Sequence, residues 1–292
     1  NVYSVYKGGP AVSRAAVGQA AVGDSAAAQM GRITALENEV KANPDNKLAW
    51  AELGNMYFDA NRPEDAILAE DMRDRLILLA GLPGFRLGVI SGRELQDLEE
   101  LVSVSGIYYA GNHGLEMDGP EFSYVNPEAE QSRPVLRELA GRLEEALSGI
   151  DGTLVEDKTY SLSVHYRLVR PERGEEVTRR IHSLADPLAE RGEIRLSSGK
   201  KVWEIRPPVD WNKGRAVETV REKIAGIFNV SRLTTVYLGD DVTDEDAFHV
   251  LRPPEGWGVY VGDDRQDSAA ACRLASPDEV GELFERLLRF ER

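Results

Sequence analysis

The sequence predicts an α/β fold in which a parallel sheet is interrupted by an inserted α+β subdomain. Short apolar strands alternate with helices over residues 72–110 and again from residue 213 onwards, which is the pattern of parallel strands joined by helical crossovers. The region between them has another rhythm, in which long helices flank alternating strands such as SLSVHYR. With 42% hydrophobic residues, the 292-residue chain can supply two cores.

The individual elements follow from periodicity and turn residues. The first parallel segment should contain helices at about 72–82 and 94–101 and strands at 86–90 and 107–110. The middle region should contain helices at 134–148 and 175–191 and strands at 161–167, 193–199 and 200–207. The last segment should contain helices at 213–227, from 244 and at 278–290, and strands at 234–239 and 256–262. We therefore expect a core of residues 71–115 and 208–292 and a cap of residues 116–207.

Composition excludes several classes of function. A net charge of −15 and a pI near 4.9 disfavour binding along nucleic acid or an anionic membrane. No stretch approaches the roughly 18 apolar residues that a membrane span needs. Cys272 is the single cysteine, which excludes an internal disulfide and suits the cytoplasm.

The N-terminal segments are of a different kind. Residues 1–31 are rich in Gly, Ala, Ser and Gln, and predict a flexible leader. Residues 32–70 predict two helices with the spacing of a tetratricopeptide repeat, carried by Trp50, Leu53, Gly54, Tyr57 and Ala66. Such repeats need about three stacked units to be stable. A helical hairpin without a function is therefore favoured over the alternative, a groove that binds a protein partner.

An acidic cluster follows the predicted strand TTVYL. Asp240, Asp241 and Asp244 are its central members, and carboxylates this close repel one another unless a cation neutralises them. Oxygen-only ligands at the end of a parallel strand indicate Mg²⁺. The alternative is an acidic turn in which Asp244 caps the next helix.

Two further segments place phosphate-binding groups at strand or helix ends. Ser91-Gly92-Arg93 follows the strand RLGVI, so a hydroxyl and backbone N–H groups open onto a helix. Lys213 begins a helix and can stabilise negative charge on a phosphoryl group. Taken singly, the first is also an ordinary helix cap and the second an ordinary surface lysine.

Taken in order, Ser91, Lys213 and the cluster at 240–244 resemble motifs II, III and IV of the haloacid-dehalogenase phosphatases, which have a Rossmann-like core. AGNHGLE at 110–116, VEDK at 155–158, SVHYR at 163–167 and EIRP at 204–207 are similar to successive signatures of trehalose-6-phosphate phosphatase, a Mg²⁺-dependent hydrolase of trehalose biosynthesis. The resemblance covers residues 72–292. It implies catalytic roles for Ser91 and Lys213, metal binding by Asp240, Asp241 and Asp244, and substrate contacts by Arg93, Asn112, His113, Lys158, Arg167 and Glu204. His165 is interpreted as a structural strand residue.

The family's opening strand, which ends in D-x-D-G-T, has no counterpart in this sequence. Its first Asp is the nucleophile and its second the general acid and base. The nearest match is Asp151-Gly152-Thr153, but Gly149 stands at the nucleophile's place, so we interpret it as a turn. Because that strand is central in the sheet, we expect a gap, closure of its two neighbours on each other, or distortion.

Three hypotheses remain open at this point. The chain is a trehalose-6-phosphate phosphatase by family, with activity impaired by the missing aspartate. Alternatively, it is a non-catalytic protein that binds a sugar phosphate and recruits a partner through its N-terminal helices. A third hypothesis is a chimeric chain joined near residues 67–71, where the pattern changes abruptly.

Overall fold

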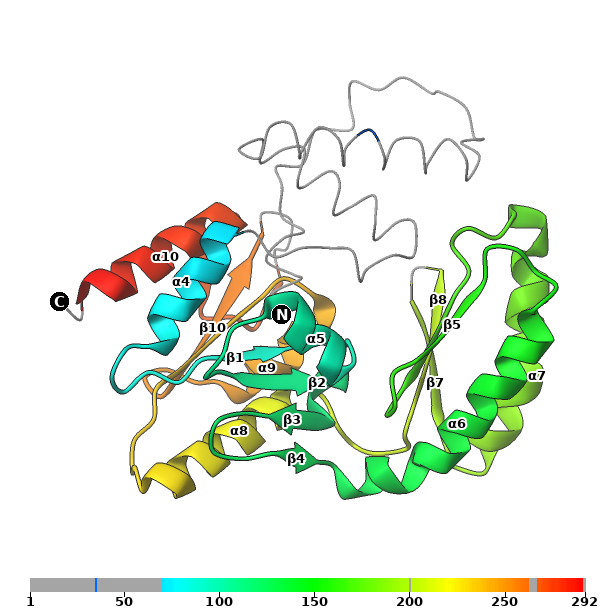
Figure 1. The fold of residues 1–292 in the computed structure, drawn as a ribbon, viewed down its shortest axis with the longest axis horizontal. Helices are drawn as coiled ribbons and strands as arrows, with labels where there is room; N and C mark the ends of the chain where they lie inside the picture. Colours follow the sequence, from blue (N-terminus) through cyan, green and yellow to red (C-terminus); the bar gives the residue numbers. More distant parts are fainter. Residues whose placement is uncertain (1–34, 36–69, 200, 263–266, 291–292) are drawn as a thin grey trace.

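A computed structural model describes residue 35 and residues 70–199, 201–262 and 267–290 of the chain. Two bodies are visible in Figure 1, a core on the left and a cap on the right, linked by two chain crossings. The predicted leader at 1–31 and almost all of the tetratricopeptide-like segment at 32–70 lie outside the described residues. Those two predictions therefore stay predictions.

The first part of the core is a four-stranded sheet in the order β1-β2-β3-β4. Its elements are α4 (Glu70–Ala80), β1 (Gly88–Ile90), α5 (Leu95–Val102), β2 (Tyr108–Gly111), the 3₁₀ turn η2 (Asn112–Gly114), β3 (Glu116–Asp118) and β4 (Tyr124–Val125). β1 and β2 are parallel, whereas β3 and β4 return antiparallel. The core sheet therefore runs past residue 115, where the sequence predicts the cap to begin.

The second part of the core is a parallel sheet in the order β11-β10-β9. Its elements are α8 (Lys213–Phe228), β9 (Thr235–Gly239), the 3₁₀ turn η4 (Val242–Asp244), α9 (Glu245–Val250), β10 (Gly256–Val261), β11 (Cys272–Leu274) and α10 (Pro277–Phe290). Every predicted strand of this segment is present. The short strand β11 has no counterpart in the prediction.

Two apolar clusters cover opposite faces of these sheets. Val89 and Val261 pack with α4, α5 and α10 on one face. Ile90 and Tyr260 pack with α8 and α9 on the other. Because successive strand residues alternate between faces, the core is a three-layer α/β/α arrangement.

The described strands of the core form two sheets rather than one. Among these strands, β1 is hydrogen-bonded only to β2 and β9 only to β10. Because residues 36–69 lie outside the described residues, the gap, closure or distortion expected at the family's opening strand stays a prediction.

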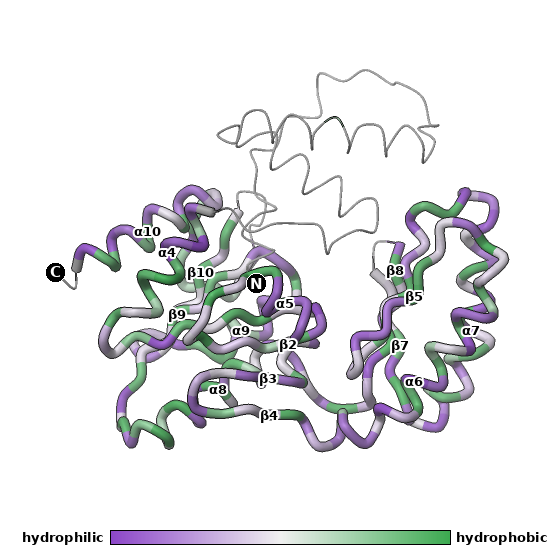
Figure 2. Tube along the Cα trace, in the orientation of Figure 1, coloured by the Kyte–Doolittle hydropathy of each residue, from purple (hydrophilic) through white to green (hydrophobic). Residues whose placement is uncertain are grey.

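The cap is a four-stranded antiparallel sheet, β5-β6-β8-β7, covered on one side by two helices. Its elements are α6 (Pro127–Leu147), β5 (Leu154–Asp157), β6 (Leu162–His165), the 3₁₀ turn η3 (Pro171–Arg173), α7 (Gly174–Glu190), β7 (Arg195–Gly199) and β8 (Val202–Arg206). Apolar residues of both helices and of β6 and β8 form its own hydrophobic cluster. Along α6 and α7, hydrophobic and hydrophilic residues alternate, as expected for helices with one buried face (Figure 2).

The start of α6 corrects the sequence prediction. The sequence predicts this helix from residue 134, but it begins at Pro127, and the Asn126 side chain accepts hydrogen bonds from the backbone N–H groups of Glu128 and Ala129. An asparagine N-cap followed by proline at the first helical position is a strong start signal. Pro134, the predicted start, lies inside the helix. Across the described residues, no helix is long and apolar enough to cross a membrane.

Candidate functional site

The site is organised by a left-handed turn at the end of β2. Asn112, His113 and Gly114 have φ values of 49°, 58° and 91°, a conformation that favours glycine and tolerates asparagine. The turn is tied to the end of β1, because the N–H of Asn112 donates to the Arg93 carbonyl and that of His113 to the Ser91 carbonyl, both at 2.7 Å. The two predicted motifs, SGR and GNHG, are thus brought together.

Ser91 and Arg93 form the entry to α5. Ser91 is buried, at 3% exposure, and its hydroxyl accepts a hydrogen bond from the backbone N–H of Arg93 at 3.2 Å. A Cβ on Gly92 would lie 2.7 Å from Nε2 of His113. Only glycine therefore lets the chain pass so close to the histidine ring.

Asn112 joins the core to the cap. Its Nδ2 donates to Oε1 of Glu116 at 2.7 Å and to the Lys158 carbonyl at 2.8 Å, and its Oδ1 accepts from the Ser161 hydroxyl. Lys158 and Ser161 belong to the cap turn between β5 and β6. Both amide hydrogens of Asn112 are therefore used in hydrogen bonds within the protein, and the residue links the core to the cap turn.

A second contact between core and cap lies beside the first. The Thr159 hydroxyl donates to Oε1 of Glu94 at 2.6 Å. The Lys158 ammonium approaches the Gly92 carbonyl at 3.5 Å. The same cap turn is thus anchored both to the SGR segment and to the GNHG turn.

His113 lies among three cations. Arg206 Nη2 donates to His113 Nε2 at 2.9 Å, and because a guanidinium can only donate, this nitrogen must be the acceptor. Burial lowers the pKa of His113 well below its usual 6.5, and the charges of Arg206, Lys213 and Lys158 lower it further. These cations come from a cap strand, a core helix and a cap turn, so positive potential converges on one neutral imidazole.

Lys213 and Asp244 form a buried ion pair. Their atoms Nζ and Oδ1 are 2.6 Å apart, at 1% and 0% side-chain exposure. The Tyr237 hydroxyl donates to the same Oδ1 at 2.7 Å, and the backbone N–H groups of Asp240 and Asp241 donate to Oδ2 at 3.0 and 2.9 Å. Burial alone would raise the pKa of Asp244, but the charge and hydrogen bond of Lys213 outweigh it and lower the pKa.

The acidic cluster fits a magnesium ion only in part. Both oxygens of Asp244 already accept protein hydrogen bonds, so its carboxylate is poorly placed to be a ligand. Asp240 stands at the end of β9, and the exposed Asp241 caps η4 through Val242 N–H. Within the described ranges, no group of three or more acidic, histidine or cysteine side chains is arranged to hold a metal. Mg²⁺ commonly takes only one or two carboxylates together with substrate phosphate and water, and Asp240 and Asp241 are the two acidic side chains of the predicted set that Lys213 and the backbone N–H groups do not occupy in the way that they occupy Asp244.

Two ion pairs line the face of the cap sheet that is opposite its helices. Oε2 of Glu156 is 3.2 Å from Lys158 Nζ and 3.1 Å from His165 Nε2. Glu204 and Arg206, two residues apart on β8, pair with each other. His165 contacts the carboxylate beside Lys158, and its interpretation as a structural strand residue stays a prediction.

Acidification is expected to test the Glu156 network. Burial alone would raise the pKa of Glu156, but the His165 hydrogen bond and the Lys158 charge lower it from 4.5 to about 2. A depressed carboxylate pKa stabilises the fold above pH 4.5, and that stability is lost as the pH falls towards about 2. Urea unfolding between pH 6 and pH 3 should show a smaller loss for Glu156→Gln than for the wild type, with roughly 3 kcal/mol at stake over the full window. Equal losses would contradict the network, and Glu144→Gln on the exposed side of α6 is the control.

Arg167 does not join the other predicted residues. It lies in the turn after β6, at the other end of that strand from the Lys158–Ser161 turn. Asp151-Gly152-Thr153 forms a turn between α6 and β5, with Gly152 at a φ of 87°, as predicted. Arg206 and Glu116 are contacts that the sequence reasoning missed. Arg206 lies two residues after Glu204 on a predicted strand, so the two side chains share a face of the sheet. That spacing could have identified Arg206 from the sequence.

Sequence comparison places this geometry beside known proteins. A family model described as trehalose-phosphatase matches residues 54–278. "Probable trehalose-phosphate phosphatase 2" of Oryza sativa subsp. japonica is 34% identical, over 80% of this chain and 65% of the relative. "Trehalose-phosphate phosphatase" of Mycolicibacterium paratuberculosis is 39% identical, over 69% and 52%. The chain thus spans about half to two thirds of the length of these curated relatives.

Solved structures agree on the fold. The structure titled "trehalose-6-phosphate phosphatase related protein" gives a TM-score of 0.64 at 19% identity, covering 78% of this chain and 90% of that one. The C-terminal domain of a Candida albicans trehalose-6-phosphate phosphatase gives 0.61 at 24% identity, covering 78% and 87%. A haloacid dehalogenase-like hydrolase from Bacteroides thetaiotaomicron gives 0.54 at 17% identity, covering 76% and 93%.

Proposed function

Because the chain belongs to the trehalose-phosphatase family, we propose that it binds trehalose 6-phosphate at the junction of its core and cap. The observation that carries the proposal is the convergence of Lys158, Arg206 and Lys213 around the neutral His113. Each of the three cations is paired with a carboxylate of the protein, Glu156, Glu204 or Asp244. Ammonium and guanidinium groups carry several N–H donors, so Lys158 and Arg206 can donate to a phosphate monoester as well.

The phosphate and the sugar would be held by different groups. Lys158 and Arg206 are the cations at the junction, while Lys213 is already paired with Asp244 and contributes its charge from the interior. Glu204, Arg93 and, in a closed form of the cap, Arg167 would contact sugar hydroxyls, which both donate and accept hydrogen bonds. The neutral imidazole ring of His113 would lie between the phosphate and the sugar. Asn112 acts indirectly, by fixing the turn that carries Lys158.

Magnesium belongs to the same proposal. Asp240 and Asp241 would hold it beside the phosphate, and the ion would neutralise charge on the phosphoryl oxygens. Asp244 is assigned instead to orienting Lys213 and to fixing the backbone of the two neighbouring aspartates.

Hydrolysis requires one more carboxylate than the described site offers. The family reaction releases trehalose and phosphate through attack by an aspartate of D-x-D-G-T, and residues 1–292 contain no such motif. We therefore propose that this chain on its own binds trehalose 6-phosphate without turning it over. Removal of an attacking group abolishes the covalent route rather than slowing it.

Calorimetry and a phosphate assay together test the proposal. Titration of the full chain with trehalose 6-phosphate and Mg²⁺ should give saturable binding, weakened about tenfold or more by Lys158→Gln and by Arg206→Gln. Arg142→Gln, an exposed arginine of α6, is the matched control. Absence of heat would reject binding at the site. Phosphate release above that of a Lys213→Ala variant would reject the claim that the chain does not hydrolyse.

A further inference from the structure

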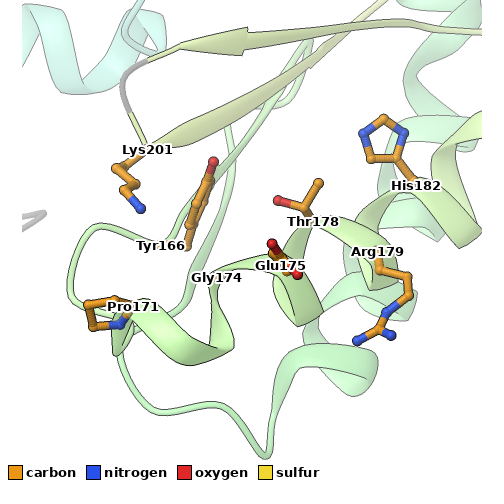
Figure 3. A pocket seen from close by; sticks show the side chains of 8 residues that line it. All are labelled: Tyr166, Pro171, Gly174, Glu175, Thr178, Arg179, His182 and Lys201. Carbon is orange, nitrogen blue, oxygen red and sulfur yellow. The ribbon is translucent and has the colours of Figure 1, made fainter.

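A cavity of about 490 Å³ lies on the surface of the cap and is open to solvent, apart from the candidate site. Its walls come from the end of β6, the start of α7 and the turn between β7 and β8, and Figure 3 shows the side chains that line it. They are Tyr166, Pro171, Glu175, Thr178, Arg179, His182 and Lys201, together with Gly174. The volume is within the range of small-molecule sites.

The cavity lies on the helix-covered side of the cap sheet. Val164 belongs to the hydrophobic cluster formed with α6 and α7, and Tyr166 packs against the same cluster. Residues at odd positions of β6 point the other way, as His165 does when it contacts Glu156 beside Lys158. A ligand in the cavity would therefore be separated from the candidate site by the thickness of the sheet.

The side chains in the cavity suit an anionic head and a hydroxylated ring. Lys201 Nζ is 5.5 Å from the centre of the Tyr166 ring and 4.0 Å from the position that a Cβ on Gly174 would take. The ammonium group therefore lies over the Tyr166 ring, on the side of the cavity where Gly174 has no side chain. In Figure 3 the Thr178 hydroxyl and the Glu175 carboxylate face the same space from α7, and Arg179 lies further along the helix. One carboxylate and one hydroxyl are the acceptors and donors that sugar hydroxyls need.

The local charge also favours an anion. Residues 166–182 contain five arginines and three glutamates, in a chain of net charge −15. Glu176 is occupied by Arg173 and Arg180. Among the described residues, neither Arg179 nor Lys201 lies within ion-pair distance of a carboxylate, so their charges are available to a ligand.

We propose that this cavity binds a small phosphorylated sugar or nucleotide, with its phosphate at Lys201, its ring against Tyr166 and its hydroxyls at Thr178 and Glu175. The site is a second one, on the opposite face of the cap sheet from the core–cap junction. Its occupancy does not depend on the proposed function.

Titration calorimetry on the full chain provides the test, with glucose 6-phosphate, AMP and inorganic phosphate as probes. Saturable binding of glucose 6-phosphate or AMP is expected, and the tighter of the two identifies the source of the ring. Lys201→Gln should weaken that binding about tenfold or more. Thr178→Val should weaken binding of the phosphorylated ring while leaving inorganic phosphate unchanged, because only the ring carries hydroxyls.

Two controls separate this cavity from the candidate site and from general charge. Lys158→Gln alters the opposite face of the sheet, and Arg142→Gln removes an exposed cation of α6; both should leave binding unchanged. Loss of binding in Lys158→Gln with retention in Lys201→Gln would overturn the proposal, as would absence of saturable binding or equal affinity for all three probes. Unchanged thermal unfolding of each variant shows that the fold is intact.

Discussion

Replacement of Asp244 by alanine is expected to lower the free energy of unfolding by about 3–5 kcal/mol. The carboxylate is fully buried and accepts hydrogen bonds from Lys213, from Tyr237 and from two backbone N–H groups. Its removal takes away the carboxylate that faces the Lys213 ammonium, which is 1% exposed in the protein interior. Chemical denaturation of the purified variant at neutral pH measures the loss.

A neighbouring acid provides the matched control. The Asp246 residue is exposed. Partial desolvation of its carboxyl group is the main cause that raises its pKa, so the fold does not stabilise the charged form of Asp246. Asp246→Ala should therefore leave stability nearly unchanged. The double variant Asp244→Ala/Lys213→Met should recover part of the loss, because no lone charge remains buried. Equal losses of unfolding free energy in Asp244→Ala and Asp246→Ala would show that the acidic cluster acts through its total charge and not through the Lys213–Asp244 ion pair.

The meeting of the SGR and GNHG segments could be predicted from the sequence. Ser91 follows β1 and Asn112 follows β2, and these two strands are parallel neighbours in one sheet. Carboxyl ends of parallel strands lie on one edge of a sheet, so residues at these positions come near each other whatever the details of packing. The GNHG turn and the SGR segment meet there through two backbone hydrogen bonds.

The roles of individual acids could not be predicted in the same way. Asp240, Asp241 and Asp244 look equivalent in the sequence, but it is the third whose carboxylate accepts a hydrogen bond from Lys213, 31 residues earlier in the chain. That choice depends on the approach of α8 to the turn η4. At this crossing, a Cβ on Gly214 would be 2.4 Å from the Asp246 carbonyl oxygen. Helix approach of this kind is a tertiary property, and no local pattern encodes it.

The cap contacts show the same limit. The cap strands and both of its helices follow from periodicity, yet one of the residues that attach the cap to the core is Asn112, for which the sequence predicts a sugar contact. Its two amide hydrogens could go either to a substrate or to the protein. The register of the β5–β6 turn against the core decides between them, because it places the Lys158 carbonyl 2.8 Å from Nδ2.

The substitution Asn112→Asp is therefore expected to be severe although it preserves shape. At neutral pH it should lower the free energy of unfolding by about 3–5 kcal/mol, since two donated hydrogen bonds are lost and a second carboxylate is placed against Glu116. Glu116 is buried, and burial is the largest cause of its raised pKa. Denaturation measured beside Asn112→Ala, which loses the bonds without adding charge, isolates the repulsion.

The pH dependence of the same variant distinguishes repulsion from simple loss of contacts. A carboxylate introduced next to Glu116 would have its pKa raised in the folded state, so the penalty is full at neutral pH and shrinks as the pH falls through that raised pKa. The difference between Asn112→Asp and Asn112→Ala should therefore narrow from pH 7 to pH 5. A constant difference would show that the introduced carboxylate does not face Glu116. Faster amide exchange at residues 158–161 in both variants would show that the cap turn is held less firmly against the core, because Asn112 supplies two of the hydrogen bonds that hold it there.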